Sequence, residues 1–257
     1  MTKIKGIILA GGDGTRLLPM TSLISKQLLP VYNKPMIYYP LSVLIQSNIK
    51  EILIITKPDE KENFKKLIGD GKKWGVSIDY LIQEKPSGIA ESLIIAEDWL
   101  KNSRTLLILG DNLFFGQGLK KLLKKVFKKK VGATIFGYKV SDPERYGVIN
   151  FNKDKKVKSI VEKPKNPKSN WAITGLYYYD ENAPKLAKNL KPSKRGELEI
   201  TDLNKEYLKK DLLDIELLGQ GFAWLDTGTP DALLEASNFV KIIETRQGIP
   251  IGDPSLG

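Results

Sequence analysis

Apolar and polar residues follow two different spacings in the first half of the chain. Short, nearly unbroken apolar runs are typical of strands buried on both faces of a sheet, and they occupy residues 4–9, 51–56, 77–81 and 105–109. Apolar residues that recur every three or four positions predict helices over residues 35–47, 59–68 and 87–100. This alternation of strand and helix predicts an α/β fold with a mostly parallel sheet that helices cover on both faces.

The pattern changes near residue 133 to strands joined by turns. Strands are predicted over residues 133–140, 146–152, 156–162, 173–179 and 212–218. Helices are predicted over residues 181–189, 199–209 and 230–247, and residues 222–229 form another apolar segment that meets a turn. We find no linker and no internal repeat. The chain is therefore predicted to be one domain over 1–257, with one part at 1–132 and 212–247 and a β-rich part at 133–211.

A cluster of glycines directly follows the first predicted strand. Gly11, Gly12 and Gly14 are followed by Thr15 and Arg16. Glycines at this place let backbone N–H groups approach a phosphate that a Cβ would block, and arginine adds a fixed positive charge. Ligands of such sheets bind at the carboxyl ends of the strands. The loop therefore predicts a site for a nucleoside triphosphate or its products, although neither common phosphate-loop pattern matches and a plain glycine turn is the alternative.

The composition excludes several kinds of chemistry. The chain has no cysteine and no histidine, which rules out disulfides, thiolate or imidazole metal ligands and catalysis by either side chain. Carboxylates, lysine, arginine, hydroxyls and a bound metal remain, and phosphoryl-type transfer suits that set. No apolar run approaches about 18 residues, and the first residues lack the layout of a signal peptide. We therefore expect a cytoplasmic protein with no membrane partner.

The formal net charge of +11 raises the possibility of nucleic-acid binding. Few of the basic residues are arginine, however, and the lysines are scattered along the chain. The densest basic run, residues 118–130, has leucines at helical spacing and lysines on the other face, which indicates a solvated helix face. We therefore expect no nucleic-acid partner and rank a nucleic-acid-binding module as the weakest alternative.

Two aspartates stand where apolar runs meet turns. Asp111 ends the run LLILGD, and Asp226 lies in FAWLDTGT. Two carboxylates together with phosphate oxygens are a common way to hold Mg²⁺, which prefers oxygen ligands. The alternative is that both residues only cap turns, which is the commoner role of aspartate at strand ends.

Other polar residues at strand ends suit a sugar phosphate or a base. Glu162 and Lys163 close the predicted strand KSIVEKP, where lysine can pair with a phosphate and glutamate can accept from sugar hydroxyls. The amide of Gln83 can pair with both the donor and the acceptor edges of a pyrimidine. The alternatives are an exposed ion pair at residues 162–163 and an ordinary polar strand end at residue 83.

The full run GGxGTRLxPxTxxxxKQLLP at residues 11–30 is more specific than any of these features. It resembles the opening of the sugar-1-phosphate nucleotidyltransferases, and KQLLP with the following KPMIYYPL resembles the glucose-1-phosphate thymidylyltransferase family in particular. The resemblance extends from Lys5 to about Gly248 and includes LGDN, YGVINF…VKSIVEKP, KPSKRGELEITD and WLDTGT. It implies a Rossmann-like three-layer α/β/α nucleotide-diphospho-sugar transferase fold, with a mixed central sheet and a β-rich sugar-binding part.

The resemblance also implies an activity: Mg²⁺-dependent transfer of a thymidylyl group from dTTP to glucose 1-phosphate by direct in-line displacement, giving dTDP-glucose and pyrophosphate. The implied catalytic residues are Arg16, Lys26, Asp111, Lys163 and Asp226, with Mg²⁺ on Asp111 and Asp226. The implied nucleotide-binding residues are Leu9, Gly11, Gly12, Gly14, Thr15, Arg16, Lys26, Gln83, Gly88 and Asp111. The implied sugar-binding residues are Asn112, Gly147, Glu162, Lys163, Ile173 and Arg195.

Alternatives remain within and outside this chemistry. The same reaction with UTP or another sugar phosphate is the nearest one, because thymine and uracil differ by one methyl group. A non-catalytic sugar-nucleotide-binding regulatory protein on the same fold is a further one. Asp13 departs from the pattern, since that position of GGxGTR is often small or uncharged. Relatives often continue beyond the position of Gly257 into helices that make subunit contacts. We expect a homo-oligomer, either a dimer or a tetramer. We make no prediction about feedback regulation.

Overall fold

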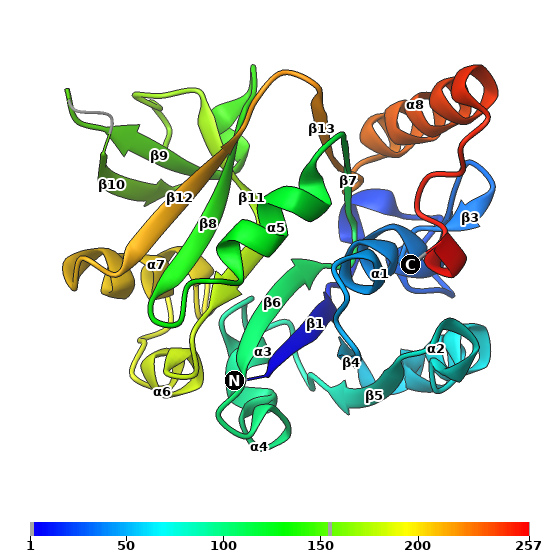
Figure 1. Ribbon diagram of the computed structural model, residues 1–257, viewed down its shortest axis with the longest axis horizontal. Coiled ribbons are helices and arrows are strands. Elements are labelled where there is room, and N and C mark those ends of the chain that lie inside the picture. The colour runs from blue at the N-terminus through cyan, green and yellow to red at the C-terminus, as the bar shows by residue number, and fades with distance from the viewer. Residues whose placement is uncertain (1–2, 154–155, 257) are drawn as a thin grey trace. The chain divides into compact units, whose positions relative to one another are not determined.

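The computed structural model describes residues 3–153 and 156–256, and the chain forms two compact units (Figure 1). The first, which we call the glycine-loop unit, comprises Ile4–Pro86, Ile108–Lys125 and Phe222–Gly257. The second, which we call the hairpin unit, comprises Ser87–Leu107 and Val126–Gly221 together with the start of the chain. Whether these units correspond to the predicted nucleotide-binding and sugar-binding parts stays a prediction.

Parallel strands form the centre of the glycine-loop unit. The strands β1 (Ile4–Ala10), β4 (Glu51–Thr56) and β5 (Ser77–Ile82) pair in parallel, and their apolar side chains are mostly buried (Figure 1). The strand β6 (Arg104–Leu109) passes from the hairpin unit into this one, where Gly110 N donates to Leu9 O at 2.9 Å. The chain segments that leave β1 and β6 therefore begin side by side.

Shorter elements surround these strands. The helices are α1 (Tyr38–Gln46), α2 (Lys61–Ile68), α5 (Leu119–Val126) and α8 (Pro230–Gln247). Two small antiparallel sheets join β7 (Asn112–Gly116) to β13 (Phe222–Asp226) and β2 (Pro30–Val31) to β3 (Lys34–Pro35). A buried apolar cluster joins β2, α1, β7 and α8, and it comprises Leu17, Val31, Met36, Tyr39, Leu113, Leu233, Ala236, Val240 and Ile251. Leu17 in this cluster anchors the segment that directly follows the glycine loop.

The hairpin unit contains a mixed sheet. The strand β8 (Ala133–Lys139) pairs antiparallel with β11 (Trp171–Tyr179) and parallel with β12 (Leu213–Leu218). The hairpin of β9 (Gly147–Phe151) and β10 (Val157–Glu162) joins β11 through β9. The helices of this unit are α3 (Glu91–Ile95), α4 (Glu97–Leu100), α6 (Ala183–Lys188) and α7 (Ile200–Lys209). The helix α7 contacts β8, β10 and β12, so it packs across this sheet.

The structure confirms the predicted α/β class and corrects some boundaries. The helix predicted over residues 87–100 is wrong at its start, because Ser87 O instead accepts from Leu198 N at 2.7 Å and Gly88 has a positive φ of 108°. The helix begins only at Glu91 and is divided at Ala96. The helix over 35–47 begins at Tyr38, because β3 occupies its first residues. The strand β7 was not predicted.

The final helix matches its prediction at both ends because its local signals agree. Thr229 caps α8, its Oγ1 accepting from Ala232 N at 3.3 Å, and Pro230 occupies the first helical position. Gly248 ends the helix in the left-handed region with φ of 65°. Among the large aromatic residues, Trp224 and Tyr177–Tyr179 are buried, and Trp171 is partly buried.

One glutamate joins three segments of the glycine-loop unit. Glu244 near the end of α8 accepts from Lys34 Nζ at 2.7 Å, from Asn33 Nδ2 at 2.9 Å and from Ile251 N at 2.7 Å. Burial opposes ionisation, but these donors outweigh it and hold the pKa of Glu244 below its usual range. The carboxylate therefore stabilises the folded state in its charged form.

We predict that Glu244→Gln lowers the free energy of unfolding at pH 7 by about 1–2 kcal/mol, because it removes the charge from three hydrogen bonds. A lowered pKa contributes stability above the pKa of the unfolded state, about 4.3, and that contribution is lost as the pH falls through the folded pKa. Denaturant unfolding should thus give a lower free energy of unfolding for the variant than for wild type at pH 7. This difference should disappear below about pH 4. Glu235→Gln, on an exposed site of α8, is the control. A difference in free energy of unfolding that is unchanged at low pH would contradict a stabilising role of the charged Glu244 carboxylate.

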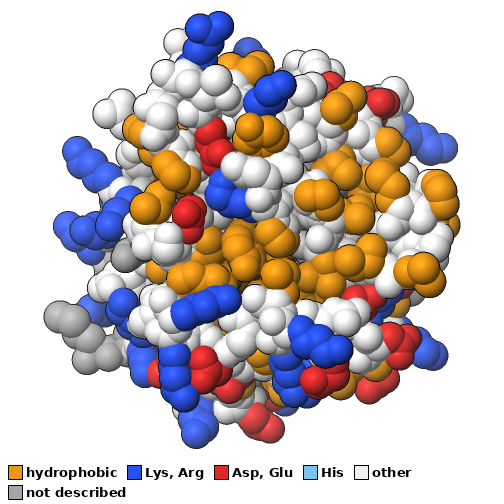
Figure 2. Space-filling model, turned by 90° about the vertical axis from the view of Figure 1, so that its right-hand side faces the viewer, with side chains coloured by type: hydrophobic (Ala, Val, Ile, Leu, Met, Phe, Trp, Pro, Cys, Tyr) orange, Lys and Arg blue, Asp and Glu red, His pale blue; other side chains and the backbone are white. Residues whose placement is uncertain are grey.

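Apolar side chains gather between charged ones on the face that Figure 2 presents. Large exposed apolar side chains of the glycine-loop unit are Leu18, Met20, Leu23, Tyr32, Leu234, Ile242, Ile249 and Leu256. Contiguous apolar surface of this kind often marks an interaction site. None of the helices in the described part of the chain combines the length and the apolar character needed to cross a bilayer.

Candidate active site

Lys26 and Asp111 form the centre of a candidate site in the glycine-loop unit. Lys26 Nζ donates to Asp111 Oδ2 although the two residues are 85 positions apart, and both side chains are largely buried. A Cβ built on Gly12 would lie 3.7 Å from Lys26 Nζ, so the ammonium group is beside the glycine loop. The structure therefore brings together the loop, the lysine and the first aspartate of the predicted site.

Asp111 is held in its charged form. Burial opposes ionisation, but the charge of Lys26 and hydrogen bonds from Lys26 and Asn112 hold the pKa of Asp111 below its usual range. Asn112 Nδ2 donates to Asp111 Oδ1 at 2.9 Å, and Asn112 Oδ1 accepts from Trp224 Nε1 at 2.6 Å. Asn112 was predicted to bind the sugar; within this unit its amide orients Asp111.

The second aspartate lies on the neighbouring strand. Asp226 at the end of β13 is the register partner of Asn112, so it lies next to the position of Asp111. Thr227 reinforces this junction, because its N and Oγ1 donate to Asp111 O at 3.1 and 2.7 Å. The pairing of β7 with β13, which the sequence did not indicate, brings Asp226 next to the backbone segment that carries Asp111, just before β7.

Arg16 and Asp226 approach the same glycine. A Cβ on Gly228 would lie 2.6 Å from Arg16 Nη2 and 3.1 Å from Asp226 Oδ1, so a side chain there would displace the guanidinium group. The arginine lies within a short 3₁₀ turn, Thr15–Leu17, that begins after Gly14, whose φ of 64° is in the left-handed region. Thr15 and Arg16 are exposed, whereas Leu17 is buried in the apolar cluster. The loop thus presents Arg16 from an anchored turn.

The remaining predicted nucleotide-binding residues of this unit lie at the ends of β1 and β5. Gln83 follows β5, is 3 % exposed, and its Oε1 contacts the position that a Cβ on Gly11 would occupy. Leu9 lies at the end of β1 and is buried. Asp13 points its carboxylate toward Lys57 Nζ, 3.4 Å away, in an exposed ion pair. The unusual carboxylate in the loop therefore has a partner of opposite charge.

The donor set of this unit suits a magnesium ion better than a softer metal. Among the described residues, no group of three or more carboxylate, histidine or cysteine side chains converges as a complete metal cage. Asp111 and Asp226, which lie at neighbouring backbone positions, nevertheless suit Mg²⁺, which usually takes one or two carboxylates and completes its shell with water and phosphate oxygens.

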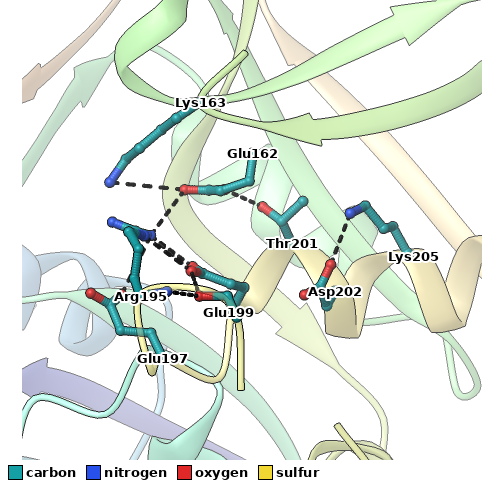
Figure 3. Close-up of polar contacts among 9 residues, drawn as sticks. Glu162, Lys163, Arg195, Glu197, Glu199, Thr201, Asp202 and Lys205 are labelled. Carbon is teal, nitrogen blue, oxygen red and sulfur yellow. Dashed lines mark hydrogen bonds and ion pairs between the residues drawn. The ribbon is translucent and has the colours of Figure 1, made fainter. Parts of the chain in front are cut away.

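A second cluster lies in the hairpin unit and is shown in Figure 3. A Cβ on Gly147 would lie 3.3 Å from Ile173 Cδ1, 3.4 Å from Glu162 Oε2 and 3.1 Å from Thr201 Oγ1. Thr201 Oγ1 donates to Glu162 Oε2 at 2.5 Å, and Thr201 is almost fully buried. The structure therefore brings together three predicted sugar-binding residues and adds Thr201, which the sequence did not single out.

Two basic residues flank Glu162 in this cluster (Figure 3). Arg195 Nη2 donates to both carboxylate oxygens of Glu199 at 2.9 Å and lies 3.8 Å from Glu162 Oε1. Partial burial lowers the pKa of Arg195, but Glu199, Glu197 and Glu162 outweigh it and raise the pKa above its usual value. Lys163 Nζ lies 3.9 Å from Glu162 Oε1, and its backbone has a positive φ of 40°, a strained conformation that is common at functional sites.

Glu199 is the second contributor that the sequence analysis missed. Its Oε1 accepts from Ser193 Oγ at 2.7 Å as well as from Arg195, so it holds the loop before α7 in place. The only available signal was its position in the stretch KPSKRGELEITD, at the first residue of the helix predicted over 199–209. The same segment explains why residue 88, in the hairpin unit, is a glycine. A Cβ there would lie 2.6 Å from Leu198 N and would collide with the backbone.

Comparisons with known proteins identify the family of this chain. The family model described as Nucleotidyl transferase matches residues 5–242. The glucose-1-phosphate thymidylyltransferase of Neisseria meningitidis serogroup A is 54 % identical over 248 residues, which cover 96 % of this chain and 86 % of that protein. The enzyme of the same name from Xanthomonas campestris pv. campestris is 55 % identical over 254 residues, covering 99 % and 86 %.

Solved structures show the same fold. A Bacillus anthracis protein provisionally named a glucose-1-phosphate thymidylyltransferase, crystallised with sucrose, superposes with a TM-score of 0.86 at 43 % identity and covers 92 % of this chain and 94 % of that one. A UDP-glucose pyrophosphorylase complexed with UDP-glucose superposes with a TM-score of 0.81 at 24 % identity, over 96 % and 100 % of the chains, which shows a shared fold. The chain therefore belongs to the nucleotidyl transferase family and, within it, to the glucose-1-phosphate thymidylyltransferases.

Proposed function

We propose that the chain transfers a thymidylyl group from dTTP to glucose 1-phosphate and releases pyrophosphate. The observation that carries this proposal is the Lys26–Asp111 pair beside Gly12, which places a cation and a carboxylate at a glycine loop. The identity of about half the residues with enzymes named for this reaction supports it. An oxygen of the glucose 1-phosphate phosphate attacks the α-phosphorus of dTTP, and the bond from that phosphorus to the bridging oxygen of pyrophosphate breaks.

We assign the glycine-loop unit to dTTP. Backbone N–H groups at Gly11, Gly12 and Gly14 approach the triphosphate, while Arg16 and Lys26 neutralise charge that develops on the departing pyrophosphate. On binding, Lys26 exchanges part of its pairing with Asp111 for phosphate oxygens. Gln83 pairs with the edge of the thymine base through its amide.

Asp111 and Asp226 are the residues that would hold Mg²⁺ in this unit. When bound, the ion supplies positive charge to phosphate oxygens and so lowers the cost of charge accumulation during transfer. Asn112 and Thr227 keep Asp111 oriented for that role through the hydrogen bonds described above.

We assign the cluster of the hairpin unit to glucose 1-phosphate. Lys163 and Arg195 pair with its phosphate, Glu162 accepts from a sugar hydroxyl, and the backbone at Gly147 and Ile173 contacts the sugar. The attacking phosphate is already anionic, so no protein nucleophile or general base is required. Orientation and charge neutralisation by these residues account for the catalysis.

A pyrophosphate-release assay tests the proposed reaction. Purified chain with dTTP, glucose 1-phosphate and Mg²⁺ should release pyrophosphate and form dTDP-glucose; absence of turnover would overturn the assignment. Replacing dTTP by UTP should lower kcat/KM by about 10- to 200-fold, the range that one methyl group in a pocket can supply. Equal or faster turnover with UTP, or with another sugar phosphate, would replace the named substrates while keeping the chemistry.

We predict that Thr201→Val weakens use of glucose 1-phosphate. Its hydroxyl donates to Glu162, so the nearly isosteric variant frees that carboxylate to turn and should raise the KM for glucose 1-phosphate by about tenfold. The KM for dTTP should change less than about twofold. Thr201→Ser, which retains the hydroxyl, should restore most of the loss, and an equal change in both KM values would contradict a role through Glu162.

We also infer that the chain forms a homo-oligomer. The exposed apolar side chains of the glycine-loop unit support this, because surface of that kind is commonly covered in an assembly. Light scattering coupled to size exclusion should give a molar mass of a dimer or a tetramer. A mass equal to one chain at micromolar concentration would contradict the inference.

A further inference from the structure

A pocket lies in the hairpin unit on the β9–β10 hairpin, apart from the residues assigned to the reaction. Its volume is about 420 Å³, which falls in the range of small-molecule sites. It is lined by Val148, Asn150, Phe151, Lys158, Ser159, Val161, Pro164, Asn166 and Lys168. In the strand register Ser159 is opposite Asn150 and Val161 opposite Val148, so these four side chains share one face of the hairpin.

That face is the opposite one from the cluster assigned to the sugar phosphate. Side chains alternate along a strand, so Gly147 and Glu162 face away from Val148 and Val161. The pocket therefore uses the second face of the strands that carry Gly147 and Glu162. A ligand there would be separated from glucose 1-phosphate by the thickness of the hairpin.

A β-bulge gives the pocket its first cation. The register between β9 and β10 shifts between Val157 and Ser159, which leaves Lys158 as the extra residue. A bulge redirects side chains, and this explains how the consecutive residues Lys158 and Ser159 both line the same pocket. Bulges are frequent beside functional sites.

The described residues that line the pocket carry positive charge and no negative charge. Lys168 supplies a second cation from the loop after β10, and no acidic residue is among the described residues that line the pocket. No ion pair is found for Lys158 or Lys168 with any residue of 3–153 or 156–256. Two such ammonium groups suit a phosphate, for which lysine is an effective point charge.

The other walls suit a ring that carries hydroxyl groups. Phe151 and Pro164 offer apolar surface, while Asn150, Ser159 and Asn166 offer donors and acceptors. Asn150 Nδ2 donates to Ser159 Oγ at 3.1 Å, but Asn150 Oδ1 is buried without a partner in the described structure.

We propose that this pocket binds a small phosphate ester of a hydroxyl-bearing ring, with the phosphate on Lys158 and Lys168 and the ring against Phe151 and Pro164. The site is independent of the proposed reaction, because it uses none of the residues assigned to either substrate.

Methyl NMR of the full chain, with labelled valine and isoleucine, tests the proposal. The probes are glucose 6-phosphate, dTMP, inorganic phosphate and glucose. Val148 and Val161 report on the pocket, and Ile173 reports on the sugar cluster. We expect glucose 6-phosphate or dTMP to shift the signals of Val148 and Val161 with a Kd at or below about 1 mM, and glucose to have no effect there.

Paired variants decide whether the shifts come from the pocket. Lys158→Ala with Lys168→Ala should weaken the response at least about fivefold, and Asn166→Asp should weaken it through charge repulsion alone. Lys156→Ala with Lys165→Ala, which removes the same charge from exposed neighbours that do not line the pocket, should bind as wild type does.

The absence of any shift of the two valine signals up to about 20 mM ligand would overturn the proposal, because the Kd would then lie well above the range of specific ligands. Shifts that persist unchanged in the Lys158/Lys168 variant would also overturn it. So would an equal response to inorganic phosphate, which would indicate an anion site without a ring. Unfolding curves of all variants should overlay the wild-type curve, and Asn166→Asp keeps the test decisive if the double variant is unstable. The measurement needs no turnover, so its result is separate from that of the pyrophosphate assay.

Discussion

Replacing Asp111 by asparagine should lower kcat for pyrophosphate release by about 100- to 1000-fold, the scale expected for loss of a group that stabilises transition-state charge. The carboxylate is placed to do so by two neighbours, since Lys26 donates to one of its oxygens and Asn112 to the other. Asparagine keeps the shape but cannot supply the negative charge that Mg²⁺ and Lys26 require. The measurement is steady-state turnover over a range of Mg²⁺ concentrations, together with thermal unfolding.

The expected pattern separates chemistry from folding. Thermal unfolding of Asp111→Asn should show a folded protein, because Thr227 bonds the backbone of Asp111 and not its side chain. Asp98→Asn, at an exposed position of α4, should leave turnover within about twofold, as surface substitutions usually do. Retention of more than a tenth of wild-type turnover by the Asp111 variant would remove this residue from the proposed chemistry.

Replacing Arg195 by alanine should lower kcat/KM for glucose 1-phosphate by about 10- to 100-fold, which corresponds to the loss of hydrogen bonds to a charged group. Three glutamates hold the guanidinium group beside Lys163, so in the folded protein it is already oriented before substrate binds. The effect should fall mainly on KM for glucose 1-phosphate and little on KM for dTTP. Initial rates with each substrate varied in turn measure this.

Two further variants sharpen the result for Arg195. Arg195→Lys should recover only part of the activity, because an ammonium group cannot make the paired hydrogen bonds of a planar guanidinium group. Lys194→Ala removes the neighbouring exposed charge and should behave as wild type does. If Lys194→Ala and Arg195→Ala lower activity equally, general surface charge and not the cluster around Glu199 is responsible.

Much of the fold could be predicted from the sequence, because the relevant signals are local. The apolar runs at β1, β4, β5 and β6 predict buried strands, and Thr229, Pro230 and Gly248 mark the ends of α8. The helical turn predicted over residues 87–90, before α3, is wrong because the deciding contact is not local. Residues near Gly88 pair with Leu198, more than a hundred positions away, and no local spacing reports such a partner.

Less of the candidate site than of the fold could be predicted from local sequence signals. The glycine loop indicated a phosphate site from its own residues, whereas the roles of Asp226, Lys163 and Arg195 came from resemblance to a family. Thr201 and Glu199 escaped notice because a threonine and a glutamate near a helix start are common in any sequence. Only their contacts with Glu162 and Arg195 distinguish them.

The sequence by itself determined most of the segments that are strands or helices, that cysteine and histidine chemistry is absent, and that a glycine-rich turn follows β1. Tertiary structure decided which charges meet, namely Lys26 with Asp111 and Arg195 with Glu199. It also brought Arg16 and Asp226 to the same glycine, Gly228. Backbone preference acts over a few neighbouring residues, whereas the distance between two side chains depends on where the chain returns after many. The pairing of β7 with β13 is such a return, and together with the hydrogen bonds from Thr227 it places Asp226 next to the segment that carries Asp111.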